Sequence, residues 1–315
     1  MTLARLLSLE SWKRWLWSFV RLTLIIGLSF VILYPILQKI STAIKDKKDL
    51  YSPIVVWIPE HYSWDNFMQV INIMDYWTTL GNTFALSSMT TVLTAASCAL
   101  AGYGFARLKF KGSGILFAGV ILTILVPPTT ILIPIYLNLK DFTLMGIIPL
   151  LTGKPLNLLN TYWPFILTSL TANSLKAGLY IFIFRQFFRG IPKEVEEAAY
   201  IDGAGIGTTF ARIMLPNAVP SIVTVTLFSF VWQWNDSFFT TTYLTSSKVM
   251  STQLASLPHN LSVQLQDGVN SKADPFYLSM VQDTGILMAI LPLIVIYLFV
   301  QRYFVESIER TGIVG

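Results

Sequence analysis

The chain has few charged residues and almost no cysteine or histidine. Of its 315 residues, 12% are charged and 54% are hydrophobic, whereas soluble domains carry about 25% charged residues. This shortage of charge excludes an ordinary water-soluble domain and predicts an all-α integral membrane protein. The single cysteine, Cys98, excludes a disulfide framework within the chain. It lies in an apolar run and is expected to be a small core residue.

Sequence patterns for nucleotide binding and catalysis are also missing. The chain contains no G-x-x-x-x-G-K-[ST], G-x-G-x-x-G or G-x-S-x-G pattern. Its two histidines, His61 and His259, lack the spacing of metal ligands. We therefore predict no catalytic residue, no metal and no cofactor. The basic residues, which give a net charge of +5, are spread over the ends of apolar runs. Nucleic-acid binding is not predicted, because it requires a gathered basic patch.

Six apolar segments, each near the ~20 residues that cross a bilayer, are the expected transmembrane helices. They cover residues 22–37, 79–106, 115–137, 162–188, 219–244 and 285–304. The prolines at 127, 128 and 134 should break the third helix. The first segment could end in a signal-peptide cleavage site after Ala43, but Tyr34-Pro35 and Gln38-Lys39 interrupt the approach to it. We expect this segment to be retained as an anchor.

The placement of lysine and arginine indicates the orientation in the membrane. One side holds, in short loops, Arg5, Lys13, Arg14, Arg21, Arg107, Lys109, Lys111, Arg185, Arg189, Lys193, Arg212, Arg302 and Arg310. The other side holds, in longer loops with Asp and Glu, Lys39, Lys45, Lys47, Lys48, Lys140, Lys154, Lys248 and Lys272. The first side is predicted to be cytosolic. The expected organisation is a cytosolic segment 1–21, a membrane domain 22–304 and a cytosolic tail 305–315. A short interfacial helix should begin near residues 63–65 on the outer side.

A compact acidic segment interrupts this apolar chain between the fourth and fifth segments, in the cytosolic loop 190–218. Residues 194–205 read EVEEAAYIDGAG. Pro192 fits the first turn of a helix, where its missing N–H costs nothing. The carboxylates of Glu194, Glu196 and Glu197 would lie near the positive end of the helix dipole. The small apolar face that lets another surface approach is formed by Ala198, Ala199 and Ile201.

Glycines follow the acidic helix directly. Gly203 and Gly205 can both adopt the positive φ that ends a helix and turns the chain. A second short helix is expected over residues 208–215, with Pro216 marking its end. The predicted object is a pair of short helices, too polar to enter the membrane and too short to be stable alone.

This loop resembles the EAA loop of bacterial ABC importer permeases. Glu197–Ala199, Gly203 and Ile213–Pro216 match every fixed position of the pattern E-A-A-x3-G-x9-I-x-L-P. In that family the loop is a coupling helix that sits in a groove of a separate ATPase subunit and transmits its closure. The resemblance implies a type I ABC importer transmembrane domain with six helices. It assigns coupling to Glu194, Glu197, Ala198, Ala199, Asp202, Gly203, Leu215 and Pro216.

The resemblance extends over nearly the whole chain and narrows to the maltose-type carbohydrate permeases. The residues that carry it are Gly102–Arg107, Arg185–Phe188 with Ile191-Pro192, Trp232–Asp236, and Trp57–Pro59 with Asn66-Phe67. The C-terminal residues 310–315 depart from that subfamily's commoner ending, which leaves any contact of the tail open. The role of the long external segment 246–283 is also open.

The resemblance implies a transport subunit and no enzyme. The implied location is a bacterial inner membrane, crossed several times with both termini cytosolic. The implied partners are a second permease subunit, two ATP-binding subunits, an extracytoplasmic solute-binding protein, membrane lipid and a carbohydrate, with an oligosaccharide favoured. Which sugar is carried is left open, because specificity in such systems resides largely in the binding protein and the partner permease.

Polar residues inside the apolar segments are candidates for a substrate pathway, because charge in a bilayer usually faces water or a bundle interior. Asn173 and Lys176 lie in the fourth segment. Either Lys176 lies near the midplane and lines the path, or it marks an outer end or a break of that helix. In the fifth segment the candidates are Trp232, Trp234, Asn235 and Asp236. These suit a sugar, but Trp is also ordinary at an interface, and Asp236 could instead bond a neighbouring helix.

Three other functions fit the sequence less well. An ABC permease for a non-sugar solute would carry the same coupling loop. A secondary transporter or channel working alone would not need the loop, and the internal repeat expected of it is not evident. An integral-membrane enzyme would need an assembled acid–base or metal site, which the sequence does not offer.

Overall fold

The computed structural model describes residues 9–52, 54–55, 57–266 and 274–312. Within these residues the regular structure is helical, apart from two isolated β-bridges, Lys45 with Tyr62 and Phe142 with Leu156. The expectation of an all-α protein is confirmed. Arg5 and Lys272, two of the residues that predict the orientation, and the last three residues of the tail lie outside the described residues.

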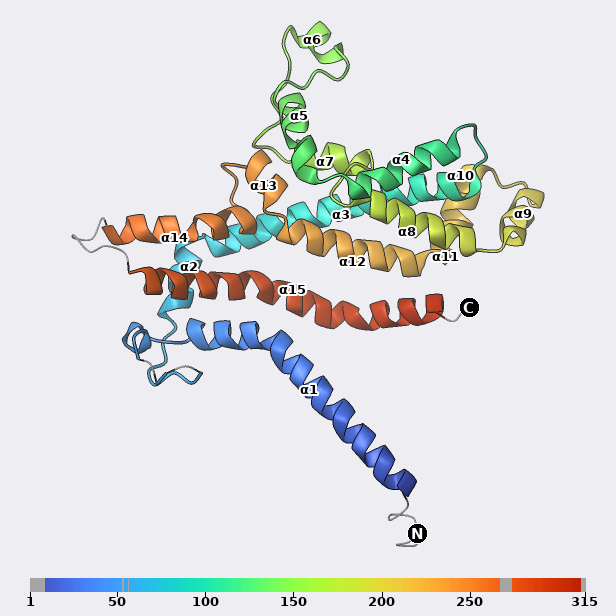
Figure 1. The fold of residues 1–315 in the computed structure, drawn as a ribbon. Coiled ribbons are helices and arrows are strands. Elements are labelled where there is room, and N and C mark those ends of the chain that lie inside the picture. Colours follow the sequence, from blue (N-terminus) through green and yellow to red (C-terminus); the bar gives the residue numbers. More distant parts are fainter. Residues whose placement is uncertain (1–8, 53, 56, 267–273, 313–315) are drawn as a thin grey trace. The chain divides into compact units, whose positions relative to one another are not determined.

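The chain forms two compact units, and each is described by itself. One unit comprises residues 1–73 and 257–290, and the other comprises residues 74–256 and 291–315. Three continuous helices are long and apolar enough to cross a membrane (Figure 1): α1 (Leu9–Ala43), α3 (Tyr76–Arg107) and α15 (Pro275–Gly312). At 1.5 Å per residue, the 32 residues of α3 span about 48 Å, which exceeds the ~30 Å hydrocarbon core. These helices contain, in order, the predicted segments 22–37, 79–106 and 285–304.

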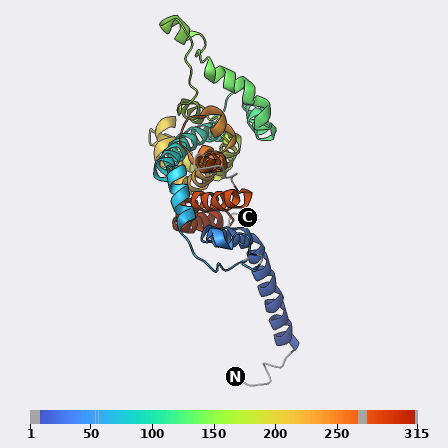
Figure 2. The same ribbon diagram turned by 90° about the vertical axis from the view of Figure 1, so that its left-hand side faces the viewer.

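Two bent helix pairs are together long and apolar enough for a span. The pair α4 (Ser113–Leu125) and α5 (Pro128–Lys140) bends by 104° (Figure 2), and the break at the proline pair that the sequence predicts is confirmed. The predicted break at Pro134 is wrong, because Pro134 lies inside α5. The second pair, residues 206–217 and α12 (Val219–Asn235), bends by 78°. By length and composition, the described residues thus hold three spans, or up to five if each bent pair counts as one.

The fourth predicted segment, 162–188, is not one helix. It consists of α7 (Trp163–Leu170) and α8 (Ala177–Gly190), separated by residues 171–176. Ala172 and Lys176 have φ of 54° and 62°, which a continuous α-helix cannot contain. The prediction of a continuous fourth helix is therefore wrong, and the six-helix count requires α7 and α8 to be taken together. The fifth segment is also shorter than predicted, because α12 ends at Asn235 and α13 (Phe238–Tyr243) follows it.

The remaining elements are short. They are η2 (Lys47–Asp49), α2 (Asp65–Ile73), α6 (Ile147–Thr152), α9 (Lys193–Ile201), α10 (Ile206–Thr209), a π-helical turn (Phe210–Met214), α11 (Leu215–Asn217) and α14 (Met250–Gln266). The predicted interfacial helix near residues 63–65 is α2, where the Ser63 hydroxyl accepts a bond from the Asp65 amide at 3.0 Å.

The core of the larger unit lies around α3, which packs against α7, α8 and α12 (Figure 1). Its buried residues from α3 and α8 include Cys98, Tyr103, Tyr180, Phe184 and Phe188. Cys98 is fully buried, as the sequence predicts. Gly102 permits the close approach of α3 and α8, because a Cβ atom built there would lie 2.5 Å from Cβ of Phe184.

Candidate functional site

The acidic segment forms a helix that ends in a glycine turn. Helix α9 begins at Lys193, and Pro192 (φ −55°, ψ 141°) is its N-cap residue, one position before the first turn in which the sequence predicted it. At its other end the amide of Gly203 bonds the Tyr200 carbonyl at 3.1 Å, and the amide of Ala204 bonds the Ala199 carbonyl at 2.9 Å. This pair of bonds is a Schellman motif, whose turn residue needs a positive φ. Gly203 supplies it with φ of 82°, so this prediction is confirmed.

The prediction for Gly205 is wrong. Its φ and ψ are −77° and 167°, an extended conformation that any residue can adopt. One glycine is enough to reverse the chain, because the Schellman motif requires a left-handed conformation at a single position. The second glycine only precedes the next helical segment.

The second helical segment is also longer than predicted. It starts at Ile206, passes through the π-helical turn 210–214 and continues through Pro216 to Asn217. Pro216 therefore does not end it. A proline inside an α-helix loses one bond and its ring crowds the carbonyl four residues earlier. The wider π-helical turn lies just before Pro216, where the Leu215 amide bonds the Phe210 carbonyl.

One face of α9 points to the outside of the unit. Glu194, Glu197, Ala198 and Ile201 are exposed and recur at intervals of three and four residues, which places them on one side of a helix. We call these four residues the outward face. Ile201 is 86% exposed, so an apolar side chain lies uncovered beside carboxylates. Ile201 was predicted on the approach face with Ala198, and its exposure agrees with that placement.

The opposite side of α9 is buried. Glu196 is 8% exposed and Ala199 is 4% exposed. Ala198 and Ala199 therefore do not form one surface, as the predicted small face supposed. Ala198 belongs to the outward face, and Ala199 packs inside the unit. Of the other predicted coupling residues, Asp202 and Pro216 are exposed and Leu215 is partly buried.

Two of the candidate pathway residues lie together. The Nζ atom of Lys176 lies 4.9 Å from the centre of the Trp232 ring, a cation–π contact. Lys176 is at the break between α7 and α8, as one of the two sequence interpretations has it, and its side chain is exposed. Trp232 is 46% exposed. Asn173 lies in the same break and is also exposed.

The other pathway candidates have partners within the unit. The carboxylate of Asp236 accepts bonds from the amides of Phe239 (3.2 Å) and Thr240 (2.8 Å), and from the Thr240 hydroxyl (2.7 Å). It therefore caps the first turn of α13. Asn235 bonds the Val231 carbonyl of its own helix at 2.8 Å, and Trp234 is 4% exposed. The structure does not bring these three residues to the exposed contact of Lys176 and Trp232.

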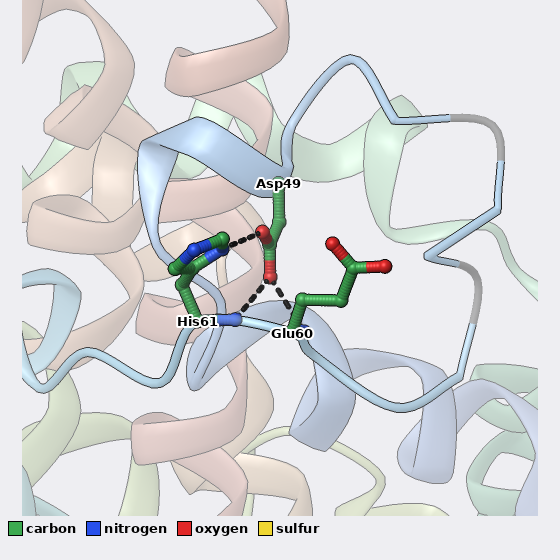
Figure 3. Close-up of side chains that lie close together, drawn as sticks. All are labelled: Asp49, Glu60 and His61. Atoms are coloured by element: carbon green, nitrogen blue, oxygen red, sulfur yellow. Dashed lines mark hydrogen bonds and ion pairs between the residues drawn. The ribbon is translucent and has the colours of Figure 1, made fainter.

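One histidine is closer to carboxylates than the sequence suggests. Asp49, Glu60 and His61 place their ligand-type atoms within 4.8 Å of one another (Figure 3). The buried Asp49 carboxylate already accepts bonds from the amides of Glu60 (2.9 Å) and His61 (2.8 Å), and contacts His61 Nδ1 at 2.7 Å. The bonds from the His61 amide and ring lower the pKa of Asp49 below its ordinary value. Because both carboxylate oxygens are occupied, the cluster fastens the loop between η2 and α2.

The chain is similar to known transport proteins over most of its length. The family model described as the binding-protein-dependent transport system inner membrane component matches residues 97–310. The probable ABC transporter permease protein YurM of Bacillus subtilis is 29% identical over 95% of this chain and 88% of its own length. The arabinooligosaccharides transport system permease protein AraQ of Halalkalibacterium halodurans is 27% identical over 91% and 93%, respectively. The melibiose/raffinose/stachyose import permease protein MelC of Bacillus subtilis is 28% identical over 88% and 89%.

A solved structure shares the fold. A chain in the crystal structure of a bacterial ABC transporter involved in the import of the acidic polysaccharide alginate superimposes with a TM-score of 0.73. The match covers 92% of this chain and 96% of the other, at 22% sequence identity. At that identity the similarity establishes the architecture of the chain.

Proposed function

Because the chain belongs to the family of binding-protein-dependent transport system inner membrane components, we propose that it is a permease subunit of an ATP-driven importer for a carbohydrate. The carbohydrate is of oligosaccharide size, in keeping with the cargoes for which the similar proteins AraQ and MelC are named. The subunit pairs with a second permease and receives its cargo from an extracytoplasmic binding protein. Two separate ATP-binding subunits supply the energy.

The outward face of α9 is the observation that carries this proposal. It presents carboxylates, a small Ala198 and an uncovered Ile201 on a helix whose end is fixed by Gly203. Such a surface suits insertion into a groove of a partner, because the apolar residue gains from burial and the small residue lets the backbone approach. Glu194, Glu197, Ala198, Asp202 and Gly203 thus make or position the ATPase contact. Ala199, Leu215 and Pro216 hold the loop in shape.

The function is tested by purifying the permease with its genomic neighbours. We expect a second permease and an ATPase to copurify, and a binding protein loaded with an oligosaccharide to stimulate ATP hydrolysis. A permease that purifies without an ATPase and transports a solute alone would contradict the proposal. If only a non-sugar solute stimulates ATP hydrolysis, the proposed cargo is wrong and the proposed import mechanism stands.

The proposed orientation places both termini and α9 in the cytosol, because the short loops on that side carry most of the arginines. Cys98 is buried, so single cysteines can be labelled with little background. With a membrane-impermeant reagent applied from outside, Ser52→Cys and Lys154→Cys should react. Lys111→Cys and Thr208→Cys should not react until the membrane is permeabilised. Efficient labelling of intact cells at position 111 would reverse the orientation.

The proposed substrate path includes Asn173, Lys176 and Trp232. An aromatic face can stack on the C–H side of a sugar, while the ammonium and amide groups bind hydroxyls. Trp234, Asn235 and Asp236 are not assigned to this contact, because Trp234 is buried, Asn235 bonds its own helix and Asp236 caps α13.

Replacing Lys176 by leucine should raise the substrate concentration for half-maximal uptake by about 3- to 10-fold, the effect of losing a hydrogen bond worth roughly 0.5–1.5 kcal/mol. Lys176→Arg is the matched control, because it keeps the cation over Trp232 and places a similarly long side chain at the same positive φ. Uptake by both variants is measured at equal amounts of inserted protein. Equal uptake curves for Lys176→Leu and the unchanged protein would remove Lys176 from the path.

A further inference from the structure

A buried carboxylate joins α9 to the end of α3. Oε1 of Glu196 accepts bonds from the hydroxyls of Tyr103 (2.7 Å) and Tyr200 (2.9 Å). Its Oε2 lies 3.6 Å from Nε of Arg107. Tyr103 and Glu196 are 3% and 8% exposed, and the side chain of Arg107 is 5% exposed. Tyr103 and Arg107 both belong to the last turns of α3, so the contact connects elements about 90 residues apart.

The same arginine holds the corner between α8 and α9. Besides its ion pair with Glu196, Arg107 donates a hydrogen bond from Nη2 to the carbonyl of Ile191, the residue between Gly190 and Pro192. Arg185 of α8 donates from Nε to the Phe105 carbonyl at 3.3 Å. The last turn of α3 is therefore tied to α8, to the corner and to α9 at once.

Aromatic packing supports these polar contacts. The Tyr103 ring lies 5.7 Å from the ring of Phe188 and 5.0 Å from that of Phe210. Phe188 belongs to α8, and Phe210 belongs to the π-helical turn that follows the glycine turn. Tyr103 thus contacts the segments before and after α9, while its hydroxyl bonds Glu196 within it.

Separating α9 from α3 would be costly. If the buried Glu196 carboxylate lost its hydrogen-bond and ion-pair partners, its charge would be left without compensation, which raises the free energy of the protein. The aromatic contacts resist the same movement, because close-packed side chains do not deform continuously and instead change between discrete packing arrangements. Helix α9 and the end of α3 therefore move as one body.

We infer that Glu196, Tyr103 and Arg107 form a rigid joint through which a displacement of α9 reaches α3, and with it the helices packed on α3. This inference rests on the proposed function, in which the outward face of α9 receives the displacement. The three residues are positioning residues: they transmit movement and contact neither substrate nor nucleotide. The sequence by itself indicates no coupling role for Glu196, because the residues that bond it lie about 90 positions away.

The joint is tested in the assembled complex by the ratio of substrate imported to ATP hydrolysed. Glu196→Gln keeps the size of the side chain and removes its charge, and Tyr103→Phe removes one hydroxyl. We expect the ratio to fall about tenfold in Glu196→Gln and about threefold in Tyr103→Phe, with the ATPase still copurifying. The double variant should fall no further than Glu196→Gln alone, because both changes break one contact. Glu60→Gln is the control for the exchange, since the Glu60 carboxylate is exposed and remote in sequence from the joint.

The outcomes distinguish a role in transmitting the movement of α9 from a role in the stability of the assembled complex. If the variants assemble and keep the unchanged ratio, the joint does not transmit movement. If they lower the amount of assembled complex while the remaining complex keeps the unchanged ratio, the cluster serves folding alone and the inference is wrong. Should Glu196→Gln fail to insert, Tyr103→Phe decides by the same ratio. If the unchanged protein neither binds an ATPase nor imports, the proposed function fails first and the joint with it.

Discussion

Replacing Gly203 by valine is expected to leave the permease in the membrane but to reduce copurification of the ATPase by about tenfold or more. Gly203 has φ of 82°, and a Cβ atom there would meet nothing within 4 Å. The cost of valine is therefore one of backbone conformation and not of collision, roughly 1–3 kcal/mol for a residue held in a sparsely populated region. The loop would adopt another turn, and the outward face would no longer be presented at the angle the partner requires.

Two substitutions in the same loop make the comparison sharp. Gly205→Val should behave like the unchanged protein, because Gly205 has an extended backbone and open space around it. Gly203→Asn should retain most of the binding, since asparagine tolerates the left-handed conformation. The measurement is the ratio of ATPase to permease in purified complexes, with substrate-stimulated hydrolysis measured on the same samples. Normal values of both in Gly203→Val would refute the coupling role of the loop.

Replacing Gly102 by alanine is expected to destabilise the larger unit strongly. The added Cβ would lie 2.5 Å from Cβ of Phe184 and 3.0 Å from the Arg185 amide nitrogen, so α3 and α8 must move apart. Overpacking of this kind costs typically about 1–3 kcal/mol. The joint described above adjoins this contact, because Tyr103 follows Gly102 and packs on Phe188. Transport should be lost together with stability.

Gly104→Ala is the matched control for this change. Both glycines lie in the last turns of α3, and each substitution brings the same gain in helix propensity, about 0.5–1 kcal/mol. A Cβ at Gly104 meets nothing within 4 Å. Thermal unfolding of the purified proteins in detergent should therefore show a lower midpoint for Gly102→Ala and an unchanged or higher one for Gly104→Ala. A midpoint for Gly102→Ala equal to that of the control would show that the helices can separate at little cost.

Local rules explain which features could be predicted from the sequence. The apolar composition predicted a helical membrane protein. In a bilayer without water, backbone N–H and C=O groups must hydrogen-bond within the chain, and a helix satisfies them. The break at Pro127 and Pro128 could be predicted because proline has no backbone N–H to donate to a helix. The turn at Gly203 could be predicted because glycine can adopt a positive φ. The family was also predicted correctly, because the loop pattern fixes residue types at fixed spacings.

Predictions failed where two local rules competed. Pro216 reads as a helix end, yet the π-helical turn before it allows the helix to continue. Residues 171–176 (TANSLK) are a polar stretch inside the apolar segment 162–188, and the sequence leaves open whether they continue the helix or break it; positive φ at two of them splits the segment. Gly205 could have turned the chain as well as Gly203, and only the observed hydrogen bonds of the Schellman motif distinguish them.

By itself, the sequence determined the class of the protein, the approximate position of its helices, the place of the acidic helix with its glycine turn and the family to which the chain belongs. Each of these depends on composition or on neighbours along the chain. The tertiary structure decided which of three adjacent carboxylates are exposed and which is buried, since Glu196 finds Tyr103 and Arg107 only when α3 lies against α9. It likewise placed Lys176 beside Trp232, which lies 56 residues later in the chain. It also made Asp236 the cap of α13. Contacts between distant segments depend on how helices pack, and the pattern of residues along one segment does not contain that information.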